Sequence, residues 1–185
     1  MRYKNVLGKV VLGMSFALAL GAPLAANADV IALQLPGIPG DAKFAANNAL
    51  PLDSIRVLTA SNSVETTVAS APGGGGGAGK AIFSNLSLVK KFGESSAPIF
   101  LLVAQGRHLQ TATLSFYRMK QNVLTKYYTI TLQDVTVASQ AWVGNSNGVD
   151  AADAESIELA YAKITLLDNE TGSSVCYDVV GNLGC

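Results

Sequence analysis

The sequence has little charge. Only 14% of its 185 residues are charged, the 13 basic and 13 acidic side chains balance, and no run of lysine and arginine occurs. Zero net charge gives no electrostatic attraction for a phosphate backbone or an anionic lipid surface, so no nucleic-acid partner is expected. The 49% of hydrophobic residues excludes a disordered chain, which buries too little apolar surface to offset its ordering entropy. One compact domain is expected.

Histidine and cysteine are scarce. His108 is the only histidine, and Cys176 and Cys185 are the only cysteines. A Ser-His-Asp hydrolase would have to use His108, yet no G-x-S-x-G elbow exists and nothing places a serine and an acid beside it. One histidine and two cysteines that are expected to be bridged do not make a four-ligand zinc site. We therefore expect no enzyme activity, no metal and no cofactor.

Residues 1–28 have the pattern of a signal peptide. The pattern consists of a positive start with Arg2, Lys4 and Lys9, an apolar stretch from Val10 to Leu20, and an A-x-A site at Ala26 to Ala28. The apolar stretch is shorter than the ~20 residues that a bilayer requires, which disfavours a retained membrane helix. Cleavage between Ala28 and Asp29 leaves a secreted or periplasmic protein with no membrane anchor. We divide the remainder into a domain at 29–167 and an extension at 168–185.

The extension contains both cysteines. Export to an oxidising compartment favours a bond between Cys176 and Cys185, with an intermolecular bridge or two free thiols as the open alternatives. Val175, Tyr177 and Val179 alternate with the residues between them, which predicts a final strand. Gly181-Asn182 then offers a turn that returns Cys185 to this strand. The strand is expected to pair either with the edge of its own domain or with that of a neighbouring subunit.

Period-two alternation of apolar residues predicts strands throughout the domain. It covers four stretches in particular, which are Ile31 to Leu35, Thr111 to Tyr117, Tyr128 to Val137 and Ile157 to Leu166. The buried parity changes near Gln133-Asp134 and again near Ala162-Lys163, and a β-bulge would explain the first change. Long strands with such bends are typical of a curved sheet or barrel. The fold class is therefore mainly β.

One segment predicts a helix. Ser95 or Ser96 is suited to cap it, Pro98 suits its first turn, Ile99 to Ala104 is apolar, and Gly106 is suited to end it. Such a short helix is expected to pack over a barrel opening or a sheet edge. Residues 43–51, 70–79 and 144–154 are expected to be loops.

Two of these loops suggest ligand sites that their context does not support. Gly74 to Lys80 matches most of a phosphate-binding loop, but Ala81 stands where serine or threonine is required and a strand, not a helix, is expected to follow. Asn145, Asn147, Asp150, Asp153 and Glu155 supply oxygen ligands for calcium without the glycine and glutamate spacing of a calcium-binding hand loop. The glycine-rich segment is instead expected to be a flexible loop between strands, and the segment with the oxygen ligands is expected to be a solvated loop.

Several strings resemble the haemolysin-coregulated protein (Hcp) family of type VI secretion systems. They are Leu33 to Asp41, Gly79 to Leu88, the predicted apolar helix together with Gly106 to Leu109 that follows it, Thr111 to Leu114, Tyr128 to Val135 and Glu155 to Ile164. The resemblance implies a two-sheet β-barrel with one short α-helix, hexameric rings that stack into tubes, small protein cargo in the ring, and no catalysis by the protein itself. The export signal, the extension from Asp168, and the lack of an aromatic segment at Arg56 to Thr59 depart from the family pattern.

Two functions follow as hypotheses. The first is a secreted structural protein that self-assembles into rings or tubes, in which the glycine loop and its neighbours make subunit contacts: Gly74, Gly75, Gly76, Gly77, Gly79 and Lys80. The alternative is a monomeric extracytoplasmic binding module that uses the same barrel to hold a peptide, a glycan or a protein partner.

Overall fold

The computed structural model describes residues 29–40, 50–68, 78–143 and 153–185. Its elements are β1 (Val30–Gln34), β2 (Ile55–Val57), β3 (Thr59–Ser61), β4 (Val64–Val68), β5 (Ala78–Phe83), β6 (Leu86–Lys91), α1 (Ser96–Gln105), β7 (His108–Lys120), β8 (Val123–Val143), β9 (Ala154–Ala160), β10 (Lys163–Asp168), β11 (Ser174–Asp178) and β12 (Leu183–Gly184). The predicted signal peptide lies outside these residues. In the described part of the chain, no helix is both long and apolar enough to cross a bilayer.

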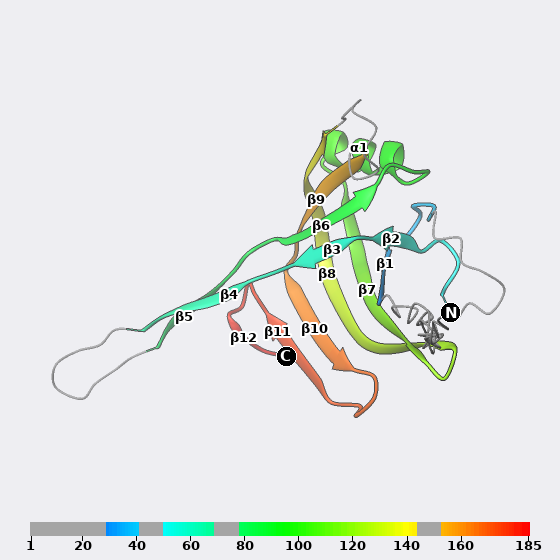
Figure 1. Ribbon diagram of the computed structural model, residues 1–185. Helices are drawn as coiled ribbons and strands as arrows, with labels where there is room; N and C mark the ends of the chain where they lie inside the picture. The colour runs from blue at the N-terminus through cyan, green and yellow to red at the C-terminus, as the bar shows by residue number, and fades with distance from the viewer. Residues whose placement is uncertain (1–28, 41–49, 69–77, 144–152) are drawn as a thin grey trace, which may run out of the picture.

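The strands close into a barrel (Figure 1). β1 pairs with β2 and β7, β7 with β8, β8 with β9, β9 with β6, and β6 with β3, all antiparallel. Only Leu58 separates β2 from β3, and its N–H donates to the carbonyl of Val89 in β6, so the circle of pairing is complete. The first half of β8 also pairs with β10, which continues to β11 and β12, while β4 and β5 form a second sheet. The predicted class, mainly β with two sheets and one short helix, is confirmed.

The barrel interior is filled by aliphatic side chains from every wall. Those with almost no exposed surface include Leu33, Ile55, Leu88, Leu114, Leu132, Val135, Ile157 and Leu159, together with Ile99 of α1. Full burial of one such side chain contributes about 1.5–3 kcal/mol relative to leaving it in water. The period-two pattern seen in the sequence therefore marks the inward face of the barrel.

The predicted change of face in β8 is confirmed, but its predicted cause is wrong. Leu132 and Val135 are both buried while Gln133 and Asp134 between them are exposed. The register against β7 does not shift there, and Asp134 instead adopts a left-handed backbone with φ 53°, which interrupts the alternation. Bulges occur elsewhere in β8, where the register shifts between Phe116 and Tyr117 of β7 and between Val137 and Ser139.

β8 changes its partner at the same position. Up to Gln133 it pairs with β10, and from Thr136 onward it pairs with β9. The second predicted bend, near Ala162-Lys163, is the junction of β9 and β10, where the N–H of Ala162 donates to the carbonyl of Gln133 at 3.0 Å. The bend at Ala162-Lys163 thus separates β9, which is part of the closed barrel, from β10, which continues the sheet toward β11 and β12.

Helix α1 lies across one end of the barrel, as predicted (Figure 1). Gly106 ends it with a left-handed φ of 60°, and the N–H groups of Gly106 and Arg107 donate to the carbonyls of Val103 and Leu102 in a Schellman arrangement. Ser95 occupies the N-cap position, as predicted, but its hydroxyl makes no cap hydrogen bond, and the Ser96 hydroxyl donates to a buried carboxylate.

The loop predictions hold only in part. Ala78 and Gly79 belong to β5, and Ala154 belongs to β9, so these ends of the predicted loops are strands. Pro51 lies outside regular structure, as expected. Most of the three loops falls outside the described residues.

Candidate functional site

β4 and β5 form an arm that projects from the barrel (Figure 1). The two strands pair antiparallel from Val64 opposite Phe83 to Val68 opposite Ala78. Val64 and Ile82 remain about 60% exposed (59% and 62%), which is unusual for apolar side chains on paired strands. Of the predicted assembly residues, Gly79 and Lys80 lie in β5 with exposed surfaces, and Gly74 to Gly77 lie outside the described residues. A phosphate-binding loop requires a helix directly after it, and here the glycine-rich segment is followed by the strand β5.

A hydrogen-bond network fixes the root of the arm to the barrel. The Asn62 amide donates to the Ser84 carbonyl at 2.8 Å and to the Tyr161 hydroxyl at 3.0 Å. The N–H of Ser63 donates to the Ser84 hydroxyl at 2.8 Å, and the N–H of Ser84 donates to the Ser63 carbonyl at 2.9 Å. Burial raises the pKa of the Tyr161 hydroxyl, so this group stays protonated in the network. The direction in which the arm leaves is therefore set by the barrel.

The C-terminal tail is attached to the barrel on the side of the arm. β11 pairs antiparallel with β10, with Ile164 opposite Tyr177, and the N–H of Val179 donates to the Ala162 carbonyl at 2.8 Å. The predicted last strand and turn are confirmed, and the strand pairs with the edge of its own domain. The extension at 168–185 continues the barrel sheet.

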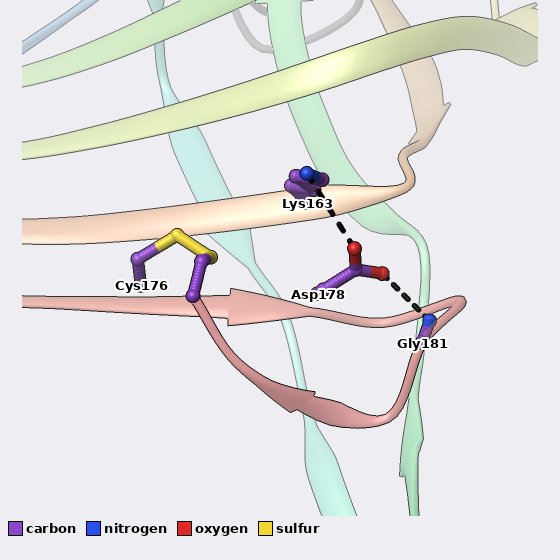
Figure 2. The surroundings of a disulfide bond; sticks show 5 residues. Lys163, Cys176, Asp178 and Gly181 are labelled. Atoms are coloured by element: carbon purple, nitrogen blue, oxygen red, sulfur yellow. Dashed lines mark hydrogen bonds and ion pairs between the residues drawn. A yellow bond between two sulfur atoms is a disulfide. The ribbon is translucent and has the colours of Figure 1, made fainter.

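A disulfide bond joins Cys176 in β11 to Cys185, with 5.3 Å between their Cα atoms (Figure 2). It holds β12 against β11, so the tail turns back on itself as the sequence predicts. Figure 2 also shows the Asp178 carboxylate, which accepts a hydrogen bond from the N–H of Gly181 at 2.6 Å and lies 3.5 Å from the Lys163 ammonium. The hydrogen bond from Gly181, and then the charge of Lys163, hold the pKa of Asp178 below its usual value.

The arm root and the tail meet over an apolar cavity of about 450 Å³. The ring of Phe83, at the end of β5, lies 5.2 Å from the ring of Tyr177 in β11. The other walls come from β3, β4, β6, β7, β8 and β10. The cavity is not predictable from the sequence, because alternation identifies the inward residues and not how closely they approach one another.

A fully buried ion pair lies at the opposite, helix-capped end. The Lys90 ammonium is 2.5 Å from Oε1 of Glu155, and neither side chain is exposed. The Ser96 hydroxyl donates to Oε1 of Glu155 at 2.8 Å, and the Gln140 amide donates to Oε2 at 2.6 Å. These contacts join β6, β8 and β9 to the first turn of α1.

The same contacts exclude Glu155 as a calcium ligand on a solvated loop. It lies in β9 and both of its carboxylate oxygens have protein partners. Within the described residues, no group of three histidine, cysteine, aspartate or glutamate side chains is arranged to hold a metal. Asn145, Asn147 and Asp150 lie outside the described residues. His108 begins β7, and its Nδ1 lies 2.9 Å from the Thr136 hydroxyl, which gives it a structural contact between two barrel strands.

The fold and these sites define a helix-capped β-barrel protein with a projecting hairpin arm and a disulfide-closed tail. The chain belongs to the Hcp family: residues 33–167 match the family described as "Type VI secretion system effector, Hcp". The match covers most of the barrel, so the resemblance seen in the sequence is confirmed. Among curated proteins, none matches the sequence.

Solved structures share the fold. Hcp1 from Salmonella typhimurium is 24% identical with a TM-score of 0.68, and the match covers 85% of this chain and 99% of that one. A type six secretion system protein matches with 19% identity and a TM-score of 0.72, over 85% of this chain and 100% of that one. A mutant of Hcp1 from E. coli EAEC 042 matches with 20% identity and a TM-score of 0.65, over 83% and 99%.

Proposed function

We propose that the chain from Asp29 onward is a structural protein that assembles with copies of itself into rings, expected to be hexameric and able to stack, as the Hcp family implies. The projecting arm carries this proposal. A two-stranded hairpin alone is marginally stable in water, and its edges present unpaired backbone groups. Val64 and Ile82 add exposed apolar surface to it. A neighbouring copy is the partner that would cover this surface.

The helix-capped end offers a second contact surface. Phe100 of α1 and Trp142 of β8 lie with ring centroids 6.0 Å apart and are about half exposed (48% and 54%). The arm leaves the barrel well away from α1 (Figure 1). Two different surfaces on one subunit support head-to-tail contacts, which generate closed rings or stacked tubes. The glycine-rich segment before β5 and Lys80 belong to the arm contact in this proposal.

The proposal includes export and the absence of catalysis. Residues 1–28 direct the chain to a secreted or periplasmic location, with cleavage between Ala28 and Asp29, and the assembled ring carries small protein cargo. The disulfide in the tail supports the oxidising location. Intact-mass analysis of the exported protein tests this part, because the expected N-terminus is Asp29. A mass that retains residues 1–28 contradicts it.

Light scattering on the 29–185 form tests the assembly. We expect a particle of about six subunits, and Ile82→Asp should weaken it by tenfold or more because an unpaired charge is then placed in an apolar contact. Val123→Asp is the matched control, since Val123 is also an exposed strand valine (54%) but lies at the start of β8. A strictly monomeric protein at high concentration would overturn the ring proposal and favour the monomeric binding module.

A further inference from the structure

The cavity between the arm root and the tail has the dimensions of a ligand site. Its volume of about 450 Å³ falls within the ~300–1,000 Å³ that small-molecule pockets occupy. Side chains from the arm, the barrel and the tail line the hollow together, so the tertiary fold builds it. It opens to solvent at its mouth, where Val175 lines the cavity and is 62% exposed.

The chemistry of the walls selects the ligand. Four aromatic rings line the cavity, those of Phe83, Phe116, Tyr128 and Tyr177, and aliphatic side chains supply most of the remainder. None of the described residues that line it is charged. An ion that entered would lose its hydration without a counter-charge, whereas an uncharged ring would gain burial and edge or offset contacts with the aromatic walls.

Two of the polar side chains that line the cavity, Asn62 and Tyr177, are already engaged. The Asn62 amide nitrogen donates to Ser84 and Tyr161, and the Tyr177 hydroxyl donates to Oδ1 of Asn182 at 3.0 Å. The cavity therefore presents ring faces and methyl groups and few free hydrogen-bonding atoms. We propose that it binds an uncharged small molecule that carries an aromatic ring. The proposal goes beyond the ring function, and of the residues named for the assembly surfaces only Val64 also lines the cavity.

The tail disulfide holds one wall of this site in place. Val175 and Tyr177 line the cavity, and Cys176 between them points to the other face of β11, as the alternation of a strand requires. The bond to Cys185 and the pairing of β12 stiffen β11 from outside the cavity. Loss of the disulfide is thus expected to weaken binding without removing any atom of the cavity wall.

A fluorescence titration with N-phenyl-1-naphthylamine, a neutral aromatic probe, tests the proposal on the 29–185 form. We expect saturable binding at one site per chain. Val175→Glu places a charge at the mouth and should raise the Kd by about tenfold or more. Val180→Glu is the matched control, because Val180 is 75% exposed on the adjacent turn and does not line the cavity; its Kd should stay within about twofold of wild type, a change of no more than ~0.4 kcal/mol.

Two further measurements make the outcome decisive. The Cys176→Ser/Cys185→Ser variant should bind the probe several-fold more weakly while keeping the far-ultraviolet circular dichroism of the wild type. The Ile82→Asp variant should bind it normally, whether or not the chain assembles. Absence of saturable binding, or an equal effect of Val175→Glu and Val180→Glu, would overturn the proposal. Binding that appears only in the Ile82→Asp variant would also overturn it, because a second copy of the chain would then fill the cavity.

Discussion

The Lys90 ammonium and the Glu155 carboxylate form an ion pair at 2.5 Å inside the barrel, with neither side chain exposed to solvent. Desolvation of two charges costs several kcal/mol per ion, which the pair offsets only while both partners and their hydrogen bonds are present. Ser96 and Gln140 supply those bonds to the carboxylate. The pair therefore holds α1 on the barrel. Removal of one partner is expected to lower the stability of the fold more than replacement of both partners by apolar residues.

Removal of Lys90 alone is expected to be strongly destabilising. Lys90→Met leaves the Glu155 carboxylate buried without a counter-charge, and we expect the free energy of unfolding to fall by about 3–5 kcal/mol. Urea denaturation of the 29–185 form measures the change. The Lys90→Met/Glu155→Leu double variant should recover most of the loss, because no isolated charge remains. A single variant as stable as the wild type would contradict the role assigned to this pair.

Removal of the disulfide is expected to have a smaller effect. The cysteines are nine residues apart, and closure of so short a loop contributes about 2–3 kcal/mol in the chain-entropy model. The Cys176→Ser/Cys185→Ser variant should lose that amount or less and keep the barrel, since the core residues lie elsewhere. Non-reducing mass spectrometry of the exported protein checks the bond itself. Two free thiols, or a disulfide-linked dimer as the main species, would disprove the intramolecular pairing.

The tail is expected to loosen in acid. The pKa of Asp178 is lowered below its ordinary value of 3.8 by the hydrogen bond from Gly181 and by Lys163. The folded state therefore binds its proton less readily than the unfolded chain. The stabilising contribution is fully present above pH 3.8 and is lost as the pH falls through the lower, folded pKa.

Amide exchange at Gly181 reports this transition, because its N–H donates to the Asp178 carboxylate. Protection should decrease below pH 3.8 in the wild type and should already be low at neutral pH in Asp178→Asn. Exchange in β7 and β8, in the barrel wall, serves as the internal reference. Equal protection at Gly181 in both proteins at neutral pH would show that the carboxylate does not hold the turn.

Lys80 is expected to act in assembly and not in nucleotide binding. It lies exposed in β5, in a strand where a phosphate-binding loop would begin a helix. Isothermal titration with ATP should therefore detect no binding to the wild type or to Lys80→Ala. Light scattering on the same variant should show weaker assembly. Saturable ATP binding that Lys80→Ala abolishes would refute this assignment.

Local chemistry made several features predictable from the sequence. Gly106 ends the helix because glycine adopts a left-handed backbone without a Cβ penalty, and the alternation around Ile157 and Leu159 identifies the buried face of one strand. The tail hairpin followed from a turn pair and two cysteines nine residues apart. The change of face near Asp134 was visible as well, although its left-handed backbone was not.

The contacts that define the sites were decided by tertiary structure. Alternation shows which side of a strand is buried, but backbone hydrogen bonds are the same for every sequence, so it does not show which strands become neighbours. The sequence places Glu155 on a solvated loop and assigns no role to Lys90, and the two side chains meet only because β6 pairs with β9 beneath α1. Phe83 and Tyr177 close the cavity only because β11 follows β10 off the barrel, at the point where β8 exchanges one partner for another. The sequence by itself determined the alternating strands and the helix end through local conformational preference, and it indicated the disulfide because the chain has only two cysteines. Long-range pairing alone determined the ion pair, the root of the arm and the cavity.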